Sequence, residues 1–291
     1  MKFPSRVLIP ALLLAALTAF AQEAPQQALE AANAVYTGGD YPAAAEAYET
    51  LLRDYPTSTI VPNAQVQLAF SYYLSGENQK SLDILGKFLT GPPAGAELGE
   101  LAALLQPQAL SALAASLKAD DPARKTNYEE AVKQFAAFIE KYPQSAEVES
   151  ALYGSAIASF QLGDYAAAQT ALETSLKRFP NSPGILDSQN LLALIFATEG
   201  SKMLGKEDAD QQAAFALYAK SAGLLGAIIE KKTDLALVNA AQFQLGEILL
   251  SEAAFAPDDR KAALLGQARN AFRGVLPKET VVALQKEKIN R

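Results

Sequence analysis

The residue types that carry most protein chemistry are missing from this sequence of 291 residues, which contains no Cys and no His. Without Cys there are no structural disulfides, thiolate nucleophiles or cysteine-bound iron–sulfur clusters. Without His the commonest general base and the commonest zinc ligand are also missing. Any catalysis would depend on carboxylates, Lys, Arg, Tyr or Ser. We therefore expect no cofactor and no metal site.

Two pairs of adjacent acids are the candidates for carboxylate chemistry, Asp120-Asp121 and Asp258-Asp259. Either pair could form part of a calcium site or a catalytic carboxylate pair, or could lie in a solvated turn that caps a helix. No EF-hand spacing surrounds them, and the Gly-rich segments lack the spacing of phosphate-binding loops. The capping interpretation is favoured, and the sequence predicts no enzyme.

Composition and charge narrow the class of protein further. Half of the residues are hydrophobic, which is enough for a packed core, and the formal net charge is −7. An acidic chain is poorly suited to bind nucleic acid phosphates, so we expect no nucleic acid partner.

Residues 1–21 have the pattern of a secretory signal peptide. Lys2 and Arg6 precede an apolar stretch over Val7–Phe20, and an Ala-Phe-Ala sequence ends at Ala21. The alternative is an uncleaved membrane anchor, but the apolar stretch is shorter than the ~20 residues that span a bilayer. No Cys follows Ala21, so we expect no direct lipid anchor. The predicted location is periplasmic or secreted, after cleavage near Ala21.

A spaced pattern of apolar residues recurs along the rest of the chain. Its first copy is Tyr41, Ala44, Tyr48, Leu51 and Pro56. Spacings of three and four place its helical members on one face, and Pro ends the helix. The six copies begin at Tyr41, Asn78, Tyr128, Tyr165, Gln211 and Leu265.

An apolar segment precedes each copy, so each unit is predicted to be a helix–turn–helix pair. These first helices are expected at Gln26–Thr37, Val61–Leu74, Leu98–Leu117, Ala146–Leu162, Ile185–Glu199 and Leu235–Ala254. Three segments rich in Gly, Pro or charge are predicted to be surface loops. They are Thr90–Gly99, Lys118–Asn127 and Gly200–Asp210.

The pattern resembles the tetratricopeptide repeat (TPR), whose period is about 34 residues. Here the shortest spacing is 37 residues, and an aromatic-Pro-x-Ser signature follows the second helix at Tyr55, Tyr142 and Phe179. This variant resembles bacterial periplasmic envelope TPR proteins, of the kind found with the Tol–Pal system and the outer-membrane β-barrel assembly machine. The resemblance implies an all-α, TPR-type α-solenoid of about six repeats over residues 22–276. Residues 277–291 would form a capping helix or the start of an extended one.

The TPR resemblance also implies where a partner would bind. In TPR proteins the first helix of each pair lines a concave surface, and aromatic and Asn side chains there suit a peptide or helix. Each candidate residue has two open interpretations, partner binding and plain packing. The candidates are Asn33, Tyr36, Phe70, Tyr73, Tyr153, Phe160, Asn190, Phe243 and Glu247.

Lys and Arg are absent from the predicted first helices Gln26–Thr37, Val61–Leu74, Ala146–Leu162 and Leu235–Ala254. Capture of an acidic peptide needs cations to bind carboxylates, so the expected ligand is a neutral, apolar or basic protein segment. The predicted function is a non-catalytic, exported scaffold or adaptor that binds proteins in the cell envelope. The alternative is a self-assembling structural component of an envelope assembly machine. The sequence leaves the oligomeric state open.

Overall fold

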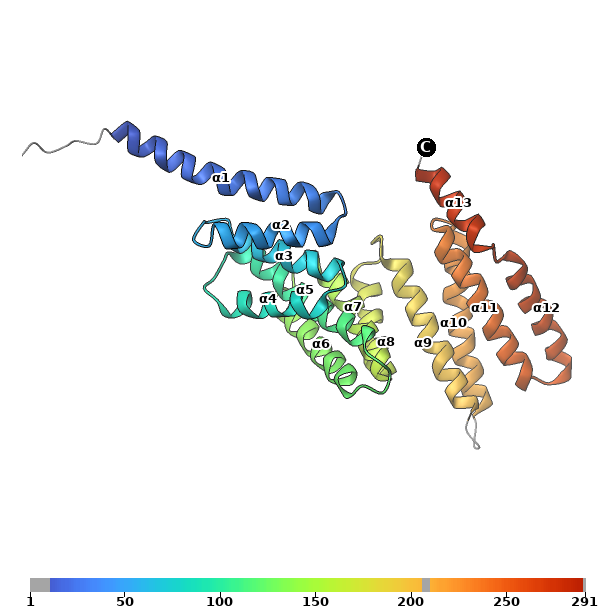
Figure 1. Cartoon of the computed structure of the whole chain (residues 1–291). Helices are drawn as coiled ribbons and strands as arrows, with labels where there is room; N and C mark the ends of the chain where they lie inside the picture. Colours follow the sequence, from blue (N-terminus) through green and yellow to red (C-terminus); the bar gives the residue numbers. More distant parts are fainter. Residues whose placement is uncertain (1–10, 206–209, 290–291) are drawn as a thin grey trace, which may run out of the picture. The chain divides into compact units, whose positions relative to one another are not determined.

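The computed structural model describes residues 11–205 and 210–289, with side chains for residues 23–205 and 210–283. Within these ranges all regular structure is helical, and the chain divides into two units, Met1–Pro143 and Gln144–Arg291. Figure 1 shows the helices in chain order. Residues 1–10, half of the predicted signal peptide, lie outside the described residues, so cleavage near Ala21 stays a prediction.

The first unit contains three helix pairs. They are α1 (Ala11–Thr37) with α2 (Tyr41–Asp54), α3 (Val61–Leu74) with α4 (Asn78–Thr90), and α5 (Ala96–Ser116) with α6 (Pro122–Lys141). Each helix contacts the next one in the chain, and α3 also contacts α5. Contact between the first helices of successive pairs is what a stacked helical repeat requires.

The second unit contains three further pairs and one additional helix. They are α7 (Val148–Leu162), α8 (Tyr165–Arg178), α9 (Ile185–Leu204), α10 (Gln211–Lys231), α11 (Leu235–Phe255), α12 (Asp258–Gly274) and α13 (Lys278–Ile289). Here α7 contacts α9 and α9 contacts α11, so the packing rule of the first unit is repeated. The predicted all-α, TPR-type fold is confirmed, with six helix pairs among the described residues.

The recurring spacing within each copy has a packing explanation. Ala44, Ala131 and Ala168 are fully buried in second helices, where the absence of a larger side chain lets a first helix approach closely. Tyr48 and Phe135 fill the space one turn further on and are also fully buried. The pattern therefore records the contact between the two helices of each pair.

Asp side chains begin several of the helices. Asp40 accepts a 3.2 Å hydrogen bond from the amide of Ala43, and Asp121 accepts one of 2.9 Å from the amide of Ala123. These acceptors satisfy amide groups that have no partner inside the helix. The capping interpretation of Asp120-Asp121 is confirmed at Asp121. Asp258 lies in the first turn of α12, where the helix dipole favours an acid.

Each of the three predicted loops was too long. The segment Lys118–Asn127 contains the start of α6, because Pro122 is a good first helical residue after an N-cap Asp. Thr90–Gly99 is shortened at both ends, since α4 includes Thr90 and α5 begins at Ala96. Gly200–Asp210 begins inside α9, and its residues 206–209 lie outside the described residues.

Gly200 lies inside α9 and has a packing role there. A Cβ atom placed on Gly200 would lie 2.9 Å from the ring of Tyr218, so Gly lets this ring pack directly against the backbone of α9. The hydroxyl of Tyr218 also lies 2.9 Å from that of Ser201. A glycine that indicated a loop in the sequence is therefore a packing residue.

One helix in the described part of the chain, α10, is long and apolar enough to cross a membrane. In this structure Tyr218, Leu225 and Ile228 of α10 are buried in a cluster with residues of α9 and α11. A core helix with one apolar row meets the same length and composition criteria.

Candidate partner-binding surface

The candidates on α1 lie at the edge of a core. Asn33 is half-buried, and its Oδ1 accepts a 2.6 Å hydrogen bond from the hydroxyl of the fully buried Tyr48. Tyr36 packs its ring edge-on against Tyr41, with centroids 5.5 Å apart. Burial raises the pKa of Tyr36, and the neighbouring Tyr41 adds to this rise. Both candidates contribute to packing between α1 and α2.

The candidates on α3 lie at the edge of another core. Phe70 and Tyr73 are half-buried, and both rest against one cluster in the first unit. That cluster consists of Val66, Ala69, Leu85, Phe88, Ala102 and Leu105. Phe70 and Tyr73 are three residues apart, which places them on one face of the helix. The structure therefore brings together two of the predicted aromatic residues.

Tyr153 on α7 lines a cavity of about 200 Å³ in the second unit. Glu149 and Asp187, from the first turns of α7 and α9, lie in the same wall. Burial raises the pKa of Tyr153, and the negative charge of Asp187 adds to the rise. Burial also raises the pKa of Asp187, with a further contribution from Asp234. The cavity therefore presents an aromatic ring and negative charge.

The remaining candidates in the second unit differ in exposure. Phe160 is half-buried and packs against Tyr165, with ring centroids 5.6 Å apart. Asn190 is also half-buried, and its Oδ1 is buried without a hydrogen-bond partner among the described residues. On α11, Phe243 is 51% exposed and Glu247 is exposed. An amide oxygen without a partner and an exposed aromatic ring are both features that a ligand could satisfy.

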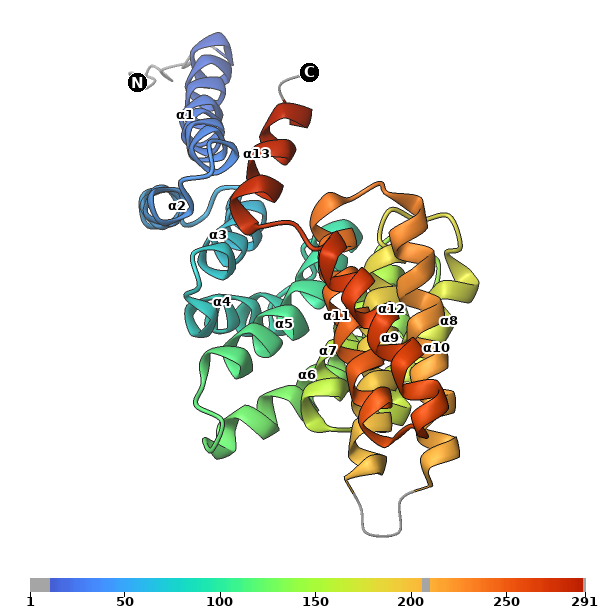
Figure 2. The same ribbon diagram turned by 90° about the vertical axis from the view of Figure 1, so that its right-hand side faces the viewer.

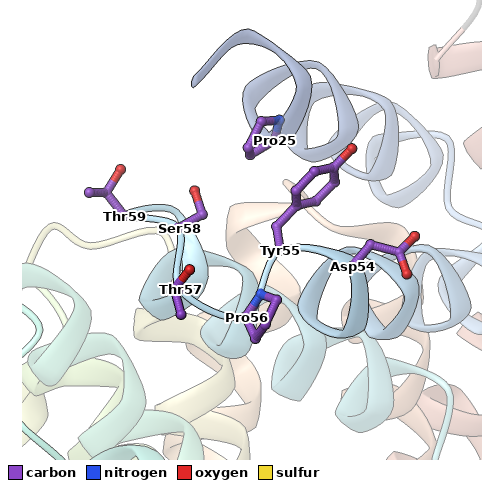
Figure 3. Close-up of a pocket in the computed structure, with 7 residues that line it drawn as sticks. All are labelled: Pro25, Asp54, Tyr55, Pro56, Thr57, Ser58 and Thr59. Atoms are coloured by element: carbon purple, nitrogen blue, oxygen red, sulfur yellow. The ribbon is translucent and has the colours of Figure 1, made fainter. Parts of the chain in front are cut away.

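A shallow pocket of about 350 Å³ was not anticipated from the sequence. Its walls are Pro25 of α1 and the segment Asp54–Thr59 that joins α2 to α3. Figure 3 shows Pro25 above this segment and the ring of Tyr55 directed toward α1. The aromatic-Pro-x-Ser signature begins at Tyr55, so it was the available signal. It indicated a turn, but not that this turn and α1 enclose a pocket.

The turn itself is held by its serine. The amide of Ser58 donates to the carbonyl of Tyr55, and the carbonyl of Ser58 accepts from the amide of Val61, each at 3.1 Å. The Ser145 side chain in the later signature accepts a 3.0 Å bond from the amide of Glu147. The signature therefore connects the end of one pair to the start of the next. Across the described ranges, no group of three or more acidic side chains is placed to hold a metal ion.

Two protein families match the sequence. The profile of the family described as "YfiO: Outer membrane lipoprotein" matches residues 21–148. The profile described as "TPR_16: Tetratricopeptide repeat" matches residues 116–183 and 153–202. No curated protein matches the chain.

Solved structures share the fold at low sequence identity. A thermophilic TPR protein of Thermus thermophilus is 17% identical with a TM-score of 0.52, over 78% of this chain and 99% of that one. A putative kinesin light chain with TPR-like repeats, from Podosopora anserina, is 14% identical with a TM-score of 0.50, over 74% and 96% of the two chains. The chain is thus similar in fold to TPR proteins and resembles bacterial envelope TPR proteins in its first half.

Proposed function

We propose that this TPR-type chain is a scaffold of the bacterial cell envelope that binds other proteins through its first helices and catalyses no reaction. The observation that carries the proposal is the match of residues 21–148 to an outer membrane lipoprotein family. That match begins where the predicted signal peptide ends. The proposed location is the periplasm or the medium, after cleavage near Ala21 as the pattern of residues 1–21 predicts.

The proposed binding residues are the nine candidates on the first helices, four in the first unit and five in the second. Phe70 and Tyr73 on α3 form their aromatic part in the first unit, because they share a face and remain partly accessible. Tyr153, Asn190 and Phe243 provide the corresponding positions in the second unit. Aromatic side chains with a polar neighbour are the usual anchors of protein interfaces.

The proposed partner segment is neutral, apolar or basic. Helices α1, α3, α5, α7 and α11 contain no Lys or Arg within their described bounds. Glu149 and Asp187 add negative charge to the cavity beside Tyr153. An acidic peptide would find no cation on these helices and would be repelled at this cavity, whereas a basic side chain would be attracted.

The test is capture from an envelope extract of the source organism by the purified, tagged chain. Tyr73→Arg places a charge on the aromatic part of the surface, and we expect recovery of the partner to fall about tenfold. Leu89→Arg is the control, because Leu89 is also partly exposed but lies on the second helix α4. Circular dichroism melting verifies that both variants are folded. Equal recovery by the two variants, or no specific protein with the unmodified chain, would overturn the proposal.

A further inference from the structure

Exposed apolar side chains gather on the last helix pair of the second unit. Phe243 and Leu250 on α11 are 51% and 41% exposed, and Leu265 on α12 is 43% exposed. Large side chains on α10 are buried instead: Leu225 and Ile228 pack with Ala241 and Ile248 of α11. Terminal repeats normally present a polar outer face, so this apolar end requires an explanation.

The exposed side chains form one continuous surface. The rings of Phe243 and Phe272 meet edge-on, with centroids 5.7 Å apart, which aligns the antiparallel helices α11 and α12 at this level. Leu250 follows Phe243 by seven residues, and Leu265 precedes Phe272 by seven. Seven residues are close to two helical turns, so both leucines return to the same side of the pair. We call Phe243, Leu250, Leu265 and Phe272 the α11–α12 outer face.

The additional helix α13 does not cover this face. It contacts α11, and Val281 is buried, but Val282 and the two leucines of the outer face remain exposed. Figures 1 and 2 show α13 extending past the end of α11 at which that helix begins.

Charges of opposite sign border the outer face. Glu247 lies on α11 between Phe243 and Leu250, four residues after the first and three before the second. Lys261 and Arg269 lie on α12, four residues before and after Leu265. All three charged residues are exposed and make no ion pair with a described residue. The face is therefore apolar at its centre, with one unpaired acidic side chain on α11 and two basic side chains on α12.

We propose that the α11–α12 outer face binds a single amphipathic helix of a partner protein. Its apolar stripe lies over Phe243, Leu250 and Leu265, with a basic side chain at Glu247 and acidic side chains at Lys261 and Arg269. One helix between two neighbouring helices contacts both of their rows, so this charge pattern is complementary to the face. Helix α1 of a second copy lacks the required basic flank, because α1 contains no Lys or Arg. The inference rests on the proposed scaffold function and deepens it, because Phe243 and Glu247 belong to the proposed binding residues and the amphipathic helix gives them a partner chemistry.

The test uses two fluorescent helical peptides and the purified full chain. Both peptides carry a leucine stripe at helical spacing. The mixed peptide has Arg along one flank and Glu along the other, and the acidic peptide has Glu along both. This comparison does not depend on peptide direction, because reversing a helix on a surface only exchanges its flanks. Fluorescence anisotropy gives the affinities.

We expect the mixed peptide to bind the unmodified chain about tenfold more tightly than the acidic peptide. Glu247→Lys makes both rows basic, and the preference should reverse toward the acidic peptide. Leu265→Asp should weaken both peptides about tenfold, because it places a charge in the apolar centre. Leu89→Asp, at an exposed leucine of the first unit, should leave both affinities unchanged.

Failure of either peptide to bind, or a preference that Glu247→Lys leaves unchanged, would overturn the inference. A concentration-dependent dimer in sedimentation velocity that Leu265→Asp dissociates would also overturn it, because the occupant would then be a second copy. None of these outcomes bears on capture through Tyr73, so the scaffold proposal can fail or survive separately. Glu247→Lys changes an exposed charge and provides a readout if Leu265→Asp does not fold.

Discussion

The hydroxyl of Tyr48 donates a 2.6 Å hydrogen bond to Oδ1 of Asn33, and this bond joins the second helix of the first pair to its first helix. Tyr48 is fully buried, whereas Asn33 is half-buried at the helix surface. A residue proposed to contact a partner is therefore also the acceptor that satisfies a core tyrosine.

Asn33→Ala should destabilise the chain more than Tyr48→Phe. Loss of Asn33 leaves a buried hydroxyl without its acceptor, at a cost of about 1–3 kcal/mol. Tyr48→Phe removes both the donor and the need for an acceptor, and should cost about 1 kcal/mol. Urea denaturation measures both free energies of unfolding. The opposite order would show that the bond does not hold the pair together.

Stability should fall at alkaline pH. Burial, with a smaller contribution from Tyr36, raises the pKa of Tyr48 to about 12. The neutral form is favoured in the folded state, so the stabilisation is complete below the unfolded pKa of about 10 and is lost as pH rises through the folded value. Burial and the hydrogen bond to Glu49 raise the pKa of Tyr72 in the same direction.

The measurement is the free energy of unfolding between about pH 9 and pH 12. Each such tyrosine contributes a slope of at most about 1.4 kcal/mol per pH unit. Tyr48→Phe should make the decline less steep. An identical decline in the variant would contradict the assignment to Tyr48.

Two glycines of the last pair should respond oppositely to Ala. A Cβ on Gly246 of α11 would lie 2.6 Å from the ring of Phe272, whereas one on Gly266 of α12 meets nothing within 4 Å. Gly246→Ala should destabilise the chain by about 1–3 kcal/mol through overpacking. Gly266→Ala should stabilise it by about 0.5–1 kcal/mol, because Ala is the better helix former.

Thermal melting of the two variants and of Gly246→Ala with Phe272→Leu checks this contrast. The smaller side chain should recover part of the loss, since the clash is with the ring. Equal destabilisation by both Gly→Ala changes would contradict the view that Gly246 is needed for the close packing of the Phe272 ring on α11.

The helices were largely predictable from the sequence because each pair repeats one spacing. The predicted Val61–Leu74 coincides with α3, and the predicted segment Ile185–Glu199 falls short of α9 by more than one turn. The errors concern residues with two roles. Pro122 begins a helix although Pro also marks loops, and Gly200 admits the ring of Tyr218 within a helix. Which role applies depends on a contact with another helix, which local spacing does not encode.

The candidate surface was less predictable than the fold. Helical periodicity places Asn33 and Tyr73 on first-helix faces, but it cannot tell which side chain a neighbouring helix uses. Tyr48 engages Asn33, whereas Tyr73 remains at the edge of a cluster. Leu250 and Leu265 have the helical spacing of core residues, so the sequence alone would place them in a core. They are exposed because no further helix covers them among the described residues.

Removal of one charge should change the titration of another. Asp234 raises the pKa of Asp187 beyond the effect of burial. Asp234→Asn keeps an oxygen that can cap α11 but removes the charge, so the pKa of Asp187 should fall. A raised carboxyl pKa in the folded state makes the protein less stable at neutral pH than at acid pH. The free energy of unfolding should therefore fall less between acid and neutral pH in Asp234→Asn than in the unmodified chain.

NMR titration of the Asp187 carboxyl carbon provides the pKa. Asp210→Asn is the control, because Asp210 is the N-cap of another helix, α10, and does not contribute to the raised pKa of Asp187. A lower pKa with Asp234→Asn alone is the expected result. An unchanged pKa would show that burial acts without Asp234.

The central claim, that the first helices contact a partner protein, is tested most directly by site-specific photo-crosslinking in intact cells. A photoreactive amino acid replaces Tyr73 on α3 in one variant and Leu89 on α4 in the other. The scaffold account predicts a discrete crosslinked adduct to another protein at Tyr73 and none at Leu89. No adduct at Tyr73, or the same adducts at both positions, would contradict it.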